Sequence, residues 1–426
     1  MRTDASGFGW FFLFIGLQRM SSRLENGDGK DPPYKVDIWH NILWTPYKAF
    51  VFSQLHAIST AGVADFRFFQ FAETNKIRRN MGGIDISLHR YPYTLLFSGN
   101  YDQVPKLALY ARAFYHVWRS DADLVVLQGY GAPEFWVQAL ACKLRGRRLA
   151  IFCDATVNDN PQSPLKVALK RVFLGLCSGV LCYGRRSVSY IQSLGVPAER
   201  IWIRCQAAVL LAPGSSAEDA LQARQAQAFD SKRPQFVFVG RLSGEKAVDV
   251  LLRAFKLFLD VLPGGVLELI GDGPDRGALV ALTQELGLEN SVKFTGVLLG
   301  EPLRQKYLAA HALVLPSLSE PWGLVVNEAL GFGCPVIVSD RCGCLPELVE
   351  AGRTGVVIRA GDIDSLAEGM IGFMTGFQNL NQVAEDCVSQ VAPYTSQRSA
   401  QQIYDACLGI IEGKPSPQVN VGASST

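Results

Sequence analysis

The 426-residue chain is short of charge and has no long apolar run. Asp, Glu, Lys and Arg make up 19% of its residues, below the usual share of about 25%, whereas hydrophobic residues make up 48%. This composition excludes a disordered protein and provides for large cores. No stretch reaches the ~18 consecutive apolar residues of a membrane-spanning helix.

The longest apolar stretch is Phe8–Leu17, which has the length of a signal-peptide core. Arg2 and Asp4 precede it, and no A-x-A cleavage site follows. We therefore expect residues 1–33 to be a flexible N-terminal extension that touches a membrane. A misassigned start codon is the alternative.

Cysteine and carboxylate spacings typical of metal sites are also missing. The ten cysteines lie in apolar runs without a CxxC pair, and no His lies near Cys342 and Cys344. We expect buried thiols in a reducing compartment. The D-x-D pairs at 121–123 and 362–364 precede a strand and a helix, so we interpret them as turn or cap acids and expect no metal cofactor.

The net charge of +2 conceals a difference between the two halves of the chain. Residues 1–215 hold 25 Lys and Arg against 15 Asp and Glu, a net of +10, and the remainder has a net of −8. Such asymmetry indicates different partners for the two halves. Nucleic acid, a membrane surface or a phosphorylated substrate could each explain the basic half.

The basic residues of the first half are clustered. The clusters are Lys76, Arg78 and Arg79; Lys143, Arg145, Arg147 and Arg148; and Lys166, Lys170 and Arg171. In the last cluster basic and apolar residues interleave at helical spacing, which is typical of helices on anionic membranes. A core-packed helix with its lysines outward fits equally well. No nucleic-acid-binding motif accompanies the clusters, so we expect no nucleic-acid partner.

Short apolar runs alternate with helical patterns along most of the chain. Strands are expected at 35–39, 65–71, 123–128, 148–153, 179–183 and 201–204, and again at 235–239, 266–270, 291–294, 312–316 and 335–338. Buried strands that alternate with helices predict parallel sheets covered on both faces. We therefore predict an α/β protein of two doubly wound, Rossmann-like domains that face each other across a cleft.

Composition shifts place the domain boundaries. We predict an N-terminal domain at 34–211, a linker rich in Ala, Gln and Ser at 212–234, a C-terminal domain at 235–390, and a C-terminal helix and tail at 391–426. Ligands of such sheets bind beyond the carboxyl ends of the strands. Candidate site residues are therefore those in the loops that follow each strand.

The loop after the 235–239 strand begins at Gly240 and carries Arg241 and Lys246 just before a helix. A helix amino terminus attracts anions, and two cations beside it suit a diphosphate. A solvated loop with two surface charges is about as plausible from these residues alone.

The loop after the 312–316 strand carries two carboxylates separated by seven residues, Glu320 and Glu328. Gly323 allows close backbone approach, and the amides of Gly323, Leu324 and Val325 would be free first-turn donors for phosphate oxygens. Glu328 lies one turn into a helix with apolar neighbours, so its charge needs a partner or a ligand such as a ribose. An ordinary helix glutamate is the alternative. Gly343, in the next such loop, is another position for close backbone approach.

The ordered segments GRLSGEK, GDGP, FTG, SEPWGLVVNEALGFGCPVI and GCLPELV resemble family-4 glycosyltransferases, which are retaining enzymes of the GT-B fold. The resemblance covers about residues 235–366. It implies that Arg241 and Lys246 hold the donor diphosphate, that Glu320 contacts the transferred sugar and that Glu328 contacts the ribose. It also implies that the backbone near Val297 meets the base. The chain has Trp322 where the family expects Phe and Cys344 where it often has Gly.

The N-terminal half resembles the family much less. Its first strand is followed by residues 39–47, WHNILWTPY, in place of a glycine-rich loop. Asp154 ends the 148–153 strand, where it could accept a proton from an acceptor or bind its hydroxyls. A turn or capping Asp is equally consistent with the sequence. His40 and His56 are further candidates, although isolated histidines in apolar surroundings are usually structural.

Together these features predict a retaining glycosyltransferase, and a hexosyltransferase in particular. It would move a sugar from a nucleotide-diphosphate donor, UDP in preference to GDP, to a glycan or lipid-linked acceptor in polysaccharide, glycolipid or cell-envelope synthesis. We expect it in the cytoplasm, or peripheral on the cytoplasmic face of a plasma or inner membrane with an anionic surface. The alternatives are a GT-B epimerase or phosphorylase, a non-catalytic subunit and a nucleic-acid-binding protein.

Overall fold

The computed structural model describes residues 34–43, 45–76, 78, 84–159, 163–204 and 216–417. The predicted N-terminal extension lies outside these residues. Within them, no helix combines the length and the apolar character needed to cross a membrane.

The first sheet has seven strands in the order β3-β2-β1-β4-β5-β6-β7, and its neighbouring strands pair in parallel. Its strands are β1 Tyr34–Ile42, β2 Ala64–Ala72, β3 Tyr93–Leu95, β4 Leu124–Leu127, β5 Arg148–Cys153, β6 Gly179–Cys182 and β7 Ile201–Ile203. The helices between them are α2 Pro46–Ala61, η1 Ile86–Leu88, η2 Tyr101–Gln103, α3 Lys106–Arg119, α4 Pro133–Leu144, α5 Pro164–Leu176, α6 Arg185–Ser193 and η3 Ala198–Arg200.

The second sheet has six parallel strands in the order β10-β9-β8-β11-β12-β13. Its strands are β8 Gln235–Val239, β9 Val266–Ile270, β10 Val292–Gly296, β11 Ala312–Leu315, β12 Val336–Ser339 and β13 Gly355–Ile358. The remaining helices are α7 Ala217–Gln225, η4 Gly244–Lys246, α8 Val248–Val261, α9 Arg276–Glu285, α10 Gly300–Ala309, α11 Leu324–Gly331, α12 Leu345–Leu348, α13 Ile363–Gly376, α14 Leu380–Val391 and α15 Ser396–Glu412.

Both sheets have the strand order of a Rossmann fold, and the predicted fold class is confirmed. The central strands are short apolar runs that are buried along their whole length, such as LVVL in β4 and ALVL in β11. Such runs suit a sheet with helices on both faces. The strand order reverses between β1 and β4 and between β8 and β11. Ligands of these folds bind at that reversal, so the loops after β8 and β11 are placed for binding.

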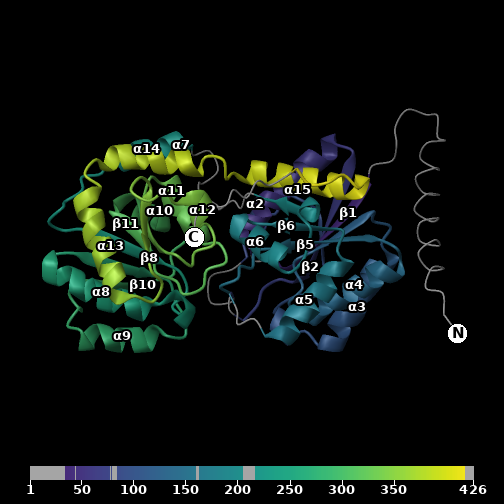
Figure 1. Cartoon of the computed structure of the whole chain (residues 1–426), viewed down its shortest axis with the longest axis horizontal. Helices are drawn as coiled ribbons and strands as arrows, with labels where there is room; N and C mark the ends of the chain where they lie inside the picture. The colour runs from purple at the N-terminus through teal and green to yellow at the C-terminus, as the bar shows by residue number, and fades with distance from the viewer. Residues whose placement is uncertain are drawn as a thin grey trace.

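Helices α14 and α15 run along one side of both domains (Figure 1). Helix α14 lies over the second domain, and α15 returns to the first, where it packs on α2. The Tyr404 hydroxyl of α15 accepts a hydrogen bond from the Val63 amide at 3.0 Å. Gly409 has no room for a side chain, because a Cβ there would lie 2.2 Å from the Trp202 ring. The chain end therefore completes the core of the domain in which the chain begins.

The predicted linker at 212–234 is not a simple connector. Helix α7 occupies part of it and begins with a capping box between Ser216 and Asp219. Arg224 of this helix is buried and donates to the carbonyl oxygens of Leu308 and Ala310 at the end of α10. These bonds attach the described part of the segment, from Ser216 onward, to the second domain.

The expected burial of the thiols is confirmed for the nine cysteines in the described part of the chain, all of which are free and buried. Burial raises the pKa of several of them, including that of Cys153 to about 12, which leaves these thiols protonated and inert.

Candidate functional site

The loops after β8 and β11 meet at an ion pair. The Lys246 ammonium pairs with the Glu320 carboxylate, and the two side chains are only 16% and 12% exposed. The Ser317 hydroxyl also donates to Glu320, at 3.4 Å. A main-chain bond of 2.9 Å from the Leu318 amide to the Glu245 carbonyl joins the same two loops. Two residues that the sequence singled out 74 positions apart therefore lie in contact.

Arg241 lies in the β8 loop and remains partly accessible, with 38% of its side chain exposed. Its guanidinium pairs with Glu245 and donates from Nε to the Ser243 hydroxyl at 3.0 Å. Ser243 in turn donates to Glu245 at 2.8 Å. Glu245 and Ser243 thus orient Arg241. The sequence did not indicate this role for either residue.

The amino terminus of α11 is an open set of backbone donors. Gly323 precedes the helix with φ 96°, a left-handed conformation that favours glycine, and no side chain caps the first turn. Among the described residues, none accepts a hydrogen bond from the amides of Gly323, Leu324 or Val325. Free amides and the helix dipole make this end suited to an anion.

Glu328 lies one turn into α11, as expected, and its partner is a tyrosine. The Tyr307 hydroxyl, from α10, donates to Glu328 Oε2 at 2.8 Å. Burial raises the pKa of Glu328 to about 7, although the Tyr307 hydrogen bond acts in the opposite direction. The sequence indicated that this charge needed a partner, but nothing in the chain pattern pointed to Tyr307.

Gly343 supports the Glu320 loop from the neighbouring strand. Its amide donates to the Glu320 carbonyl oxygen at 2.8 Å, and a Cβ at this position would lie 1.8 Å from the carbonyl oxygen of Pro321. The close backbone approach predicted for this glycine is therefore made to the protein itself, and its amide is already engaged.

Gly240 and Val297, the two remaining positions predicted to contact the donor, lie at strand ends. Gly240 directly follows β8 and donates its amide to the Ile270 carbonyl at 3.0 Å. Val297 directly follows β10 and is partly exposed. Both are at the carboxyl edge of the second sheet, the edge that also carries Glu320.

The loop after β5 approaches this edge from the first domain. Asp154 opens the loop and is exposed, while its carbonyl oxygen accepts from the Ser187 hydroxyl at 3.2 Å. Asp159 accepts a 3.2 Å hydrogen bond from Ser319, the neighbour of Glu320. The Asn158 side chain accepts from Arg341. The loop bearing Asp154 is thus joined directly to the loop bearing Glu320.

A buried cationic cluster lies in the first domain, and the sequence did not predict it. Lys48 of α2 is 1% exposed, donates to the Tyr183 hydroxyl at 2.6 Å and has no described carboxylate in ion-pair range. Burial lowers its pKa well below the usual value. The Arg204 guanidinium, also buried, lies 3.6 Å from the centre of the same tyrosine ring. Lysines are so rarely buried that only the folded chain could reveal this one.

His40 and the first acid of each D-x-D pair have structural roles. His40 is 2% exposed, its Nδ1 lies 2.9 Å from the Ile42 carbonyl oxygen, and burial lowers its pKa to about 3. Asp121 pairs with Lys35 and Arg67. Asp362 caps α13 by accepting from the Ser365 amide at 2.9 Å. Within the described residues, no three His, Cys, Asp or Glu side chains gather as metal ligands.

A second helix amino terminus at the domain boundary, that of α6, is occupied. The Arg185 amide donates to the Glu347 carboxylate of the opposite domain. A Cβ on Gly184 would lie 2.5 Å from the Trp322 ring, so the two domains touch closely here. Burial raises the pKa of Glu347 to about 7. Sequence gave no sign of this contact, because its two sides are 162 residues apart.

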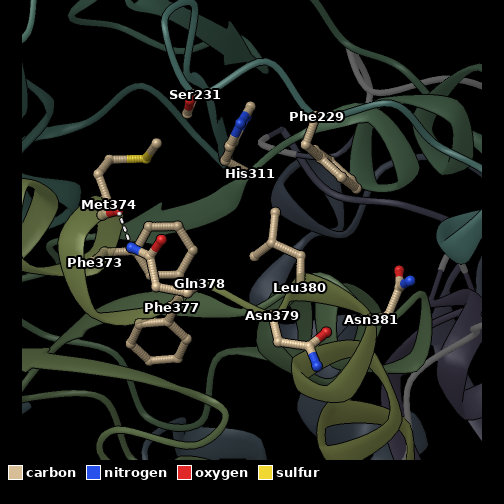
Figure 2. Close-up of a pocket in the computed structure, with 10 residues that line it drawn as sticks. All are labelled: Phe229, Ser231, His311, Phe373, Met374, Phe377, Gln378, Asn379, Leu380 and Asn381. Carbon is tan, nitrogen blue, oxygen red and sulfur yellow. Dashed lines mark hydrogen bonds between the residues drawn. The ribbon is translucent and has the colours of Figure 1, made fainter.

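A cavity of about 340 Å³ lies elsewhere, at the amino end of β11 (Figure 2). His311 and the aromatic side chains of Phe229, Phe373 and Phe377 line it, with Asn379 and Asn381 at its rim. Because Glu320 follows the carboxyl end of β11, this cavity is at the opposite edge of the sheet from the candidate site.

The fold and the carboxyl-edge site together define a protein of the GT-B architecture, and comparisons with known proteins agree. Residues 219–386 match the family model for glycosyl transferases group 1. The resemblance to glycosyltransferases is thereby confirmed for the C-terminal domain at the level of group 1.

Individual relatives are similar over part of the chain. The D-inositol 3-phosphate glycosyltransferase of Nocardia farcinica is 33% identical over 190 residues, which cover 42% of this chain and 42% of that protein. Sulfoquinovosyl transferase SQD2 of Arabidopsis thaliana is 35% identical over 138 residues, which cover 32% of this chain and 25% of that protein. The chain thus spans less than half the length of these curated relatives.

Solved structures resemble the whole fold. Anabaena Alr3699/HepE in complex with UDP-glucose has a TM-score of 0.66 at 20% identity, covering 88% of this chain and 99% of that chain. WaaG, a glycosyltransferase involved in lipopolysaccharide biosynthesis, has a TM-score of 0.60 at 18% identity, covering 89% and 100%. At this level of identity the likeness establishes the fold.

Proposed function

We propose that this protein is a retaining, family-4 glycosyltransferase that moves a hexose from a nucleotide-diphosphate sugar to a glycan or lipid-linked acceptor. The observation that carries the proposal is the meeting of Lys246, Glu320 and the uncapped amino terminus of α11 at one sheet edge. A cation, a carboxylate and free amides at one point suit a diphosphate joined to a sugar.

The donor would lie along the carboxyl edge of the second sheet. Lys246, Arg241 and the amides of Gly323, Leu324 and Val325 would hold the diphosphate and stabilise the charge that develops as it leaves. Glu320 would position the sugar, and Glu328 would accept the ribose hydroxyls. In this arrangement the cations and amides neutralise the leaving group, so we propose no metal cofactor.

Uridine is the proposed base, to be met by the backbone near Val297. Solved structures of the similar Anabaena protein contain UDP, or UDP-glucose, which supports a UDP-sugar donor. Gly240 and Gly343 would allow the loops after β8 and β12 to pass close to the donor site.

The acceptor would enter from the first domain, with attack on the same face of the sugar that the diphosphate leaves. Asp154, exposed at the end of β5 and joined through its loop to Ser319, would bind the acceptor hydroxyl or take its proton. We place the reaction in polysaccharide, glycolipid or envelope synthesis, in the cytoplasm or at the cytoplasmic face of a membrane.

A panel of UDP- and GDP-sugars tests the proposal by calorimetric binding and by hydrolysis of the donor. We expect a UDP-hexose to bind and to be turned over slowly without acceptor, and the transferred sugar to keep its anomeric configuration by NMR. An inverted product would contradict retention. Conversion of the free donor to an epimer, or a requirement for inorganic phosphate, would replace the transferase with an epimerase or a phosphorylase. Absence of donor binding would favour a non-catalytic subunit.

A further inference from the structure

Exposed apolar side chains are concentrated on one layer of the first domain. Sixteen large hydrophobic side chains are exposed in the described part of the chain, and eight of them lie on α3, α4 and α5. These helices total only 39 residues. Scattered exposed apolar residues are ordinary, but a concentration of this kind marks an interaction surface.

Helix α5 has the pattern of a helix that lies in a membrane interface. Leu165, Leu169 and Val172 are 71%, 49% and 59% exposed, and their spacing of four and three residues places them on one stripe. Lys166 and Arg171 are also exposed, and at 100° per residue they fall on the two sides of this stripe. The helix is anchored in the core by Phe173 and Leu174, which are buried.

The neighbouring helices extend the same surface. In Figure 1, α3, α4 and α5 lie side by side over the first sheet. Trp136 of α4 packs edge-on against Phe173 of α5 with ring centres 4.9 Å apart. The Arg145 guanidinium, just after α4, lies 5.4 Å from the centre of the Trp118 ring of α3. Trp118, an amphipathic aromatic residue, is 39% exposed.

The charge of this layer is of one sign. Helices α3, α4 and α5 contain seven Lys and Arg and a single carboxylate, Glu134, which is 1% exposed. These three helices therefore offer cations and apolar side chains to a partner and no exposed acidic side chain of their own. A protein partner would ordinarily bring acids and bases together, whereas an anionic bilayer offers negative headgroups over an apolar interior.

We infer that the outer face of α3, α4 and α5 docks on an anionic lipid bilayer, with Leu165, Leu169 and Val172 inserted among the headgroups. Strand β5 ends at Cys153 and α5 begins at Pro164, so Asp154 and the start of α5 belong to the same edge of the first sheet, the edge that docking brings toward the membrane. Val157 of the loop after β5 is itself 62% exposed. If the proposed function holds, this orientation presents the acceptor side of the site to a lipid-borne substrate.

Vesicle flotation of the full chain tests the docking. We expect binding to phosphatidylcholine vesicles that contain phosphatidylglycerol and about tenfold weaker binding to phosphatidylcholine alone. The double variant L165S/L169S should lose about tenfold in affinity for the anionic vesicles, because two inserted leucines are removed. The variant K166Q/R171Q should lose the preference for phosphatidylglycerol while keeping its leucines.

The matched control is L257S/V261S on α8 of the other domain. It removes two apolar residues of the same i, i+4 spacing, 40% and 59% exposed, and should bind vesicles like the wild type. If L165S/L169S binds as well as the wild type, the docking face is wrong and any vesicle binding comes from elsewhere, for example from Phe8–Leu17. If light scattering shows a dimer that L165S/L169S dissociates, the face is an interface between two copies instead.

Donor assays without vesicles separate this inference from the proposed function. All of the surface variants should bind UDP and hydrolyse the UDP-sugar like the wild type. If the wild-type protein does not bind the donor, the proposed transferase function is wrong. The flotation experiment would then still decide whether the face docks on membranes.

Discussion

Two helix amino termini lie where the domains meet, and they are used differently. That of α11 has no capping side chain and no described acceptor for its first amides, whereas that of α6 receives the Glu347 carboxylate from the opposite domain. Both have the positive end of a helix dipole. The difference indicates that the amino terminus of α6 serves the contact between the domains, and that α11 keeps its amino terminus open for a ligand.

The largest expected effect comes from removing the cation beside α11. In Lys246→Ala the diphosphate would lose its ammonium, so kcat for donor hydrolysis should fall about a hundredfold to a thousandfold. Steady-state hydrolysis of the UDP-sugar measures this. Lys256→Ala, which breaks an exposed ion pair with Asp260 on α8, should leave the rate unchanged. A rate within about threefold of wild type for the first variant would remove Lys246 from the site and weaken the distinction drawn for α11.

Gly343→Ala tests the packing of Gly343 against the Glu320 loop, which precedes the open amino terminus of α11. The added Cβ would overlap the Pro321 carbonyl oxygen, so the Glu320 loop must move, and we expect a loss of about 2–3 kcal/mol in the free energy of unfolding, together with loss of donor hydrolysis. Urea unfolding measures the first quantity. Gly277→Ala is the control, since its position in α9 has open space, and it should be neutral or stabilising. Unaltered stability in Gly343→Ala would show that the loop is not held as described.

A pH titration tests the role of Glu328 within α11. Burial raises its pKa from the ordinary value of 4.5 to about 7, so folding favours the protonated form. The stability it contributes is complete below a pH of 4.5 and is lost as the pH rises through about 7. Glu328→Gln keeps an acceptor for Tyr307 without this titration. The free energy of unfolding of the variant should therefore rise relative to wild type by about 1–3 kcal/mol between acidic and mildly alkaline pH. A difference that does not change with pH would contradict this account.

The smallest effect on stability is expected at the amino terminus of α6, which Glu347 occupies. Glu347→Ala removes the cap on α6 and should cost about 1 kcal/mol in the free energy of unfolding, with donor binding retained. Glu350→Ala, nearby on the same segment, removes an exposed ion pair with Arg353 and should cost less than about 0.5 kcal/mol. Loss of donor binding in Glu347→Ala would mean that the α6 contact belongs to the donor site, and the two termini would no longer differ in kind.

Much of the fold was predictable because buried parallel strands leave a strong local signal. The bounds expected for β5, β8 and β9 match the structure, since each is an apolar run between turn residues. Strand β3 was missed because it has only three residues and none of them is buried. Helix α7 was missed because Ala, Gln and Ser also occur in linkers.

The candidate site was predictable in part for a different reason. Arg241, Lys246, Glu320 and Glu328 follow strands, so chain order alone places them at one edge of a parallel sheet. The partner of Glu328 comes from another element, Tyr307 of α10, and the contacts of Asp159 with Ser319 and of Glu347 with Arg185 cross between the two domains. Such pairs depend on the packing of distant segments, which a single sequence does not specify.

The return of α15 to the first domain has a mechanical consequence. The chain passes between the domains twice, once between Arg204 and Ser216 and once between Val391 and Ser396. The second crossing consists of the four residues between α14 and α15, which span at most about 14 Å when fully extended. Since α15 is packed on α2, this short span limits how far the two domains can part at that point when a donor and an acceptor enter.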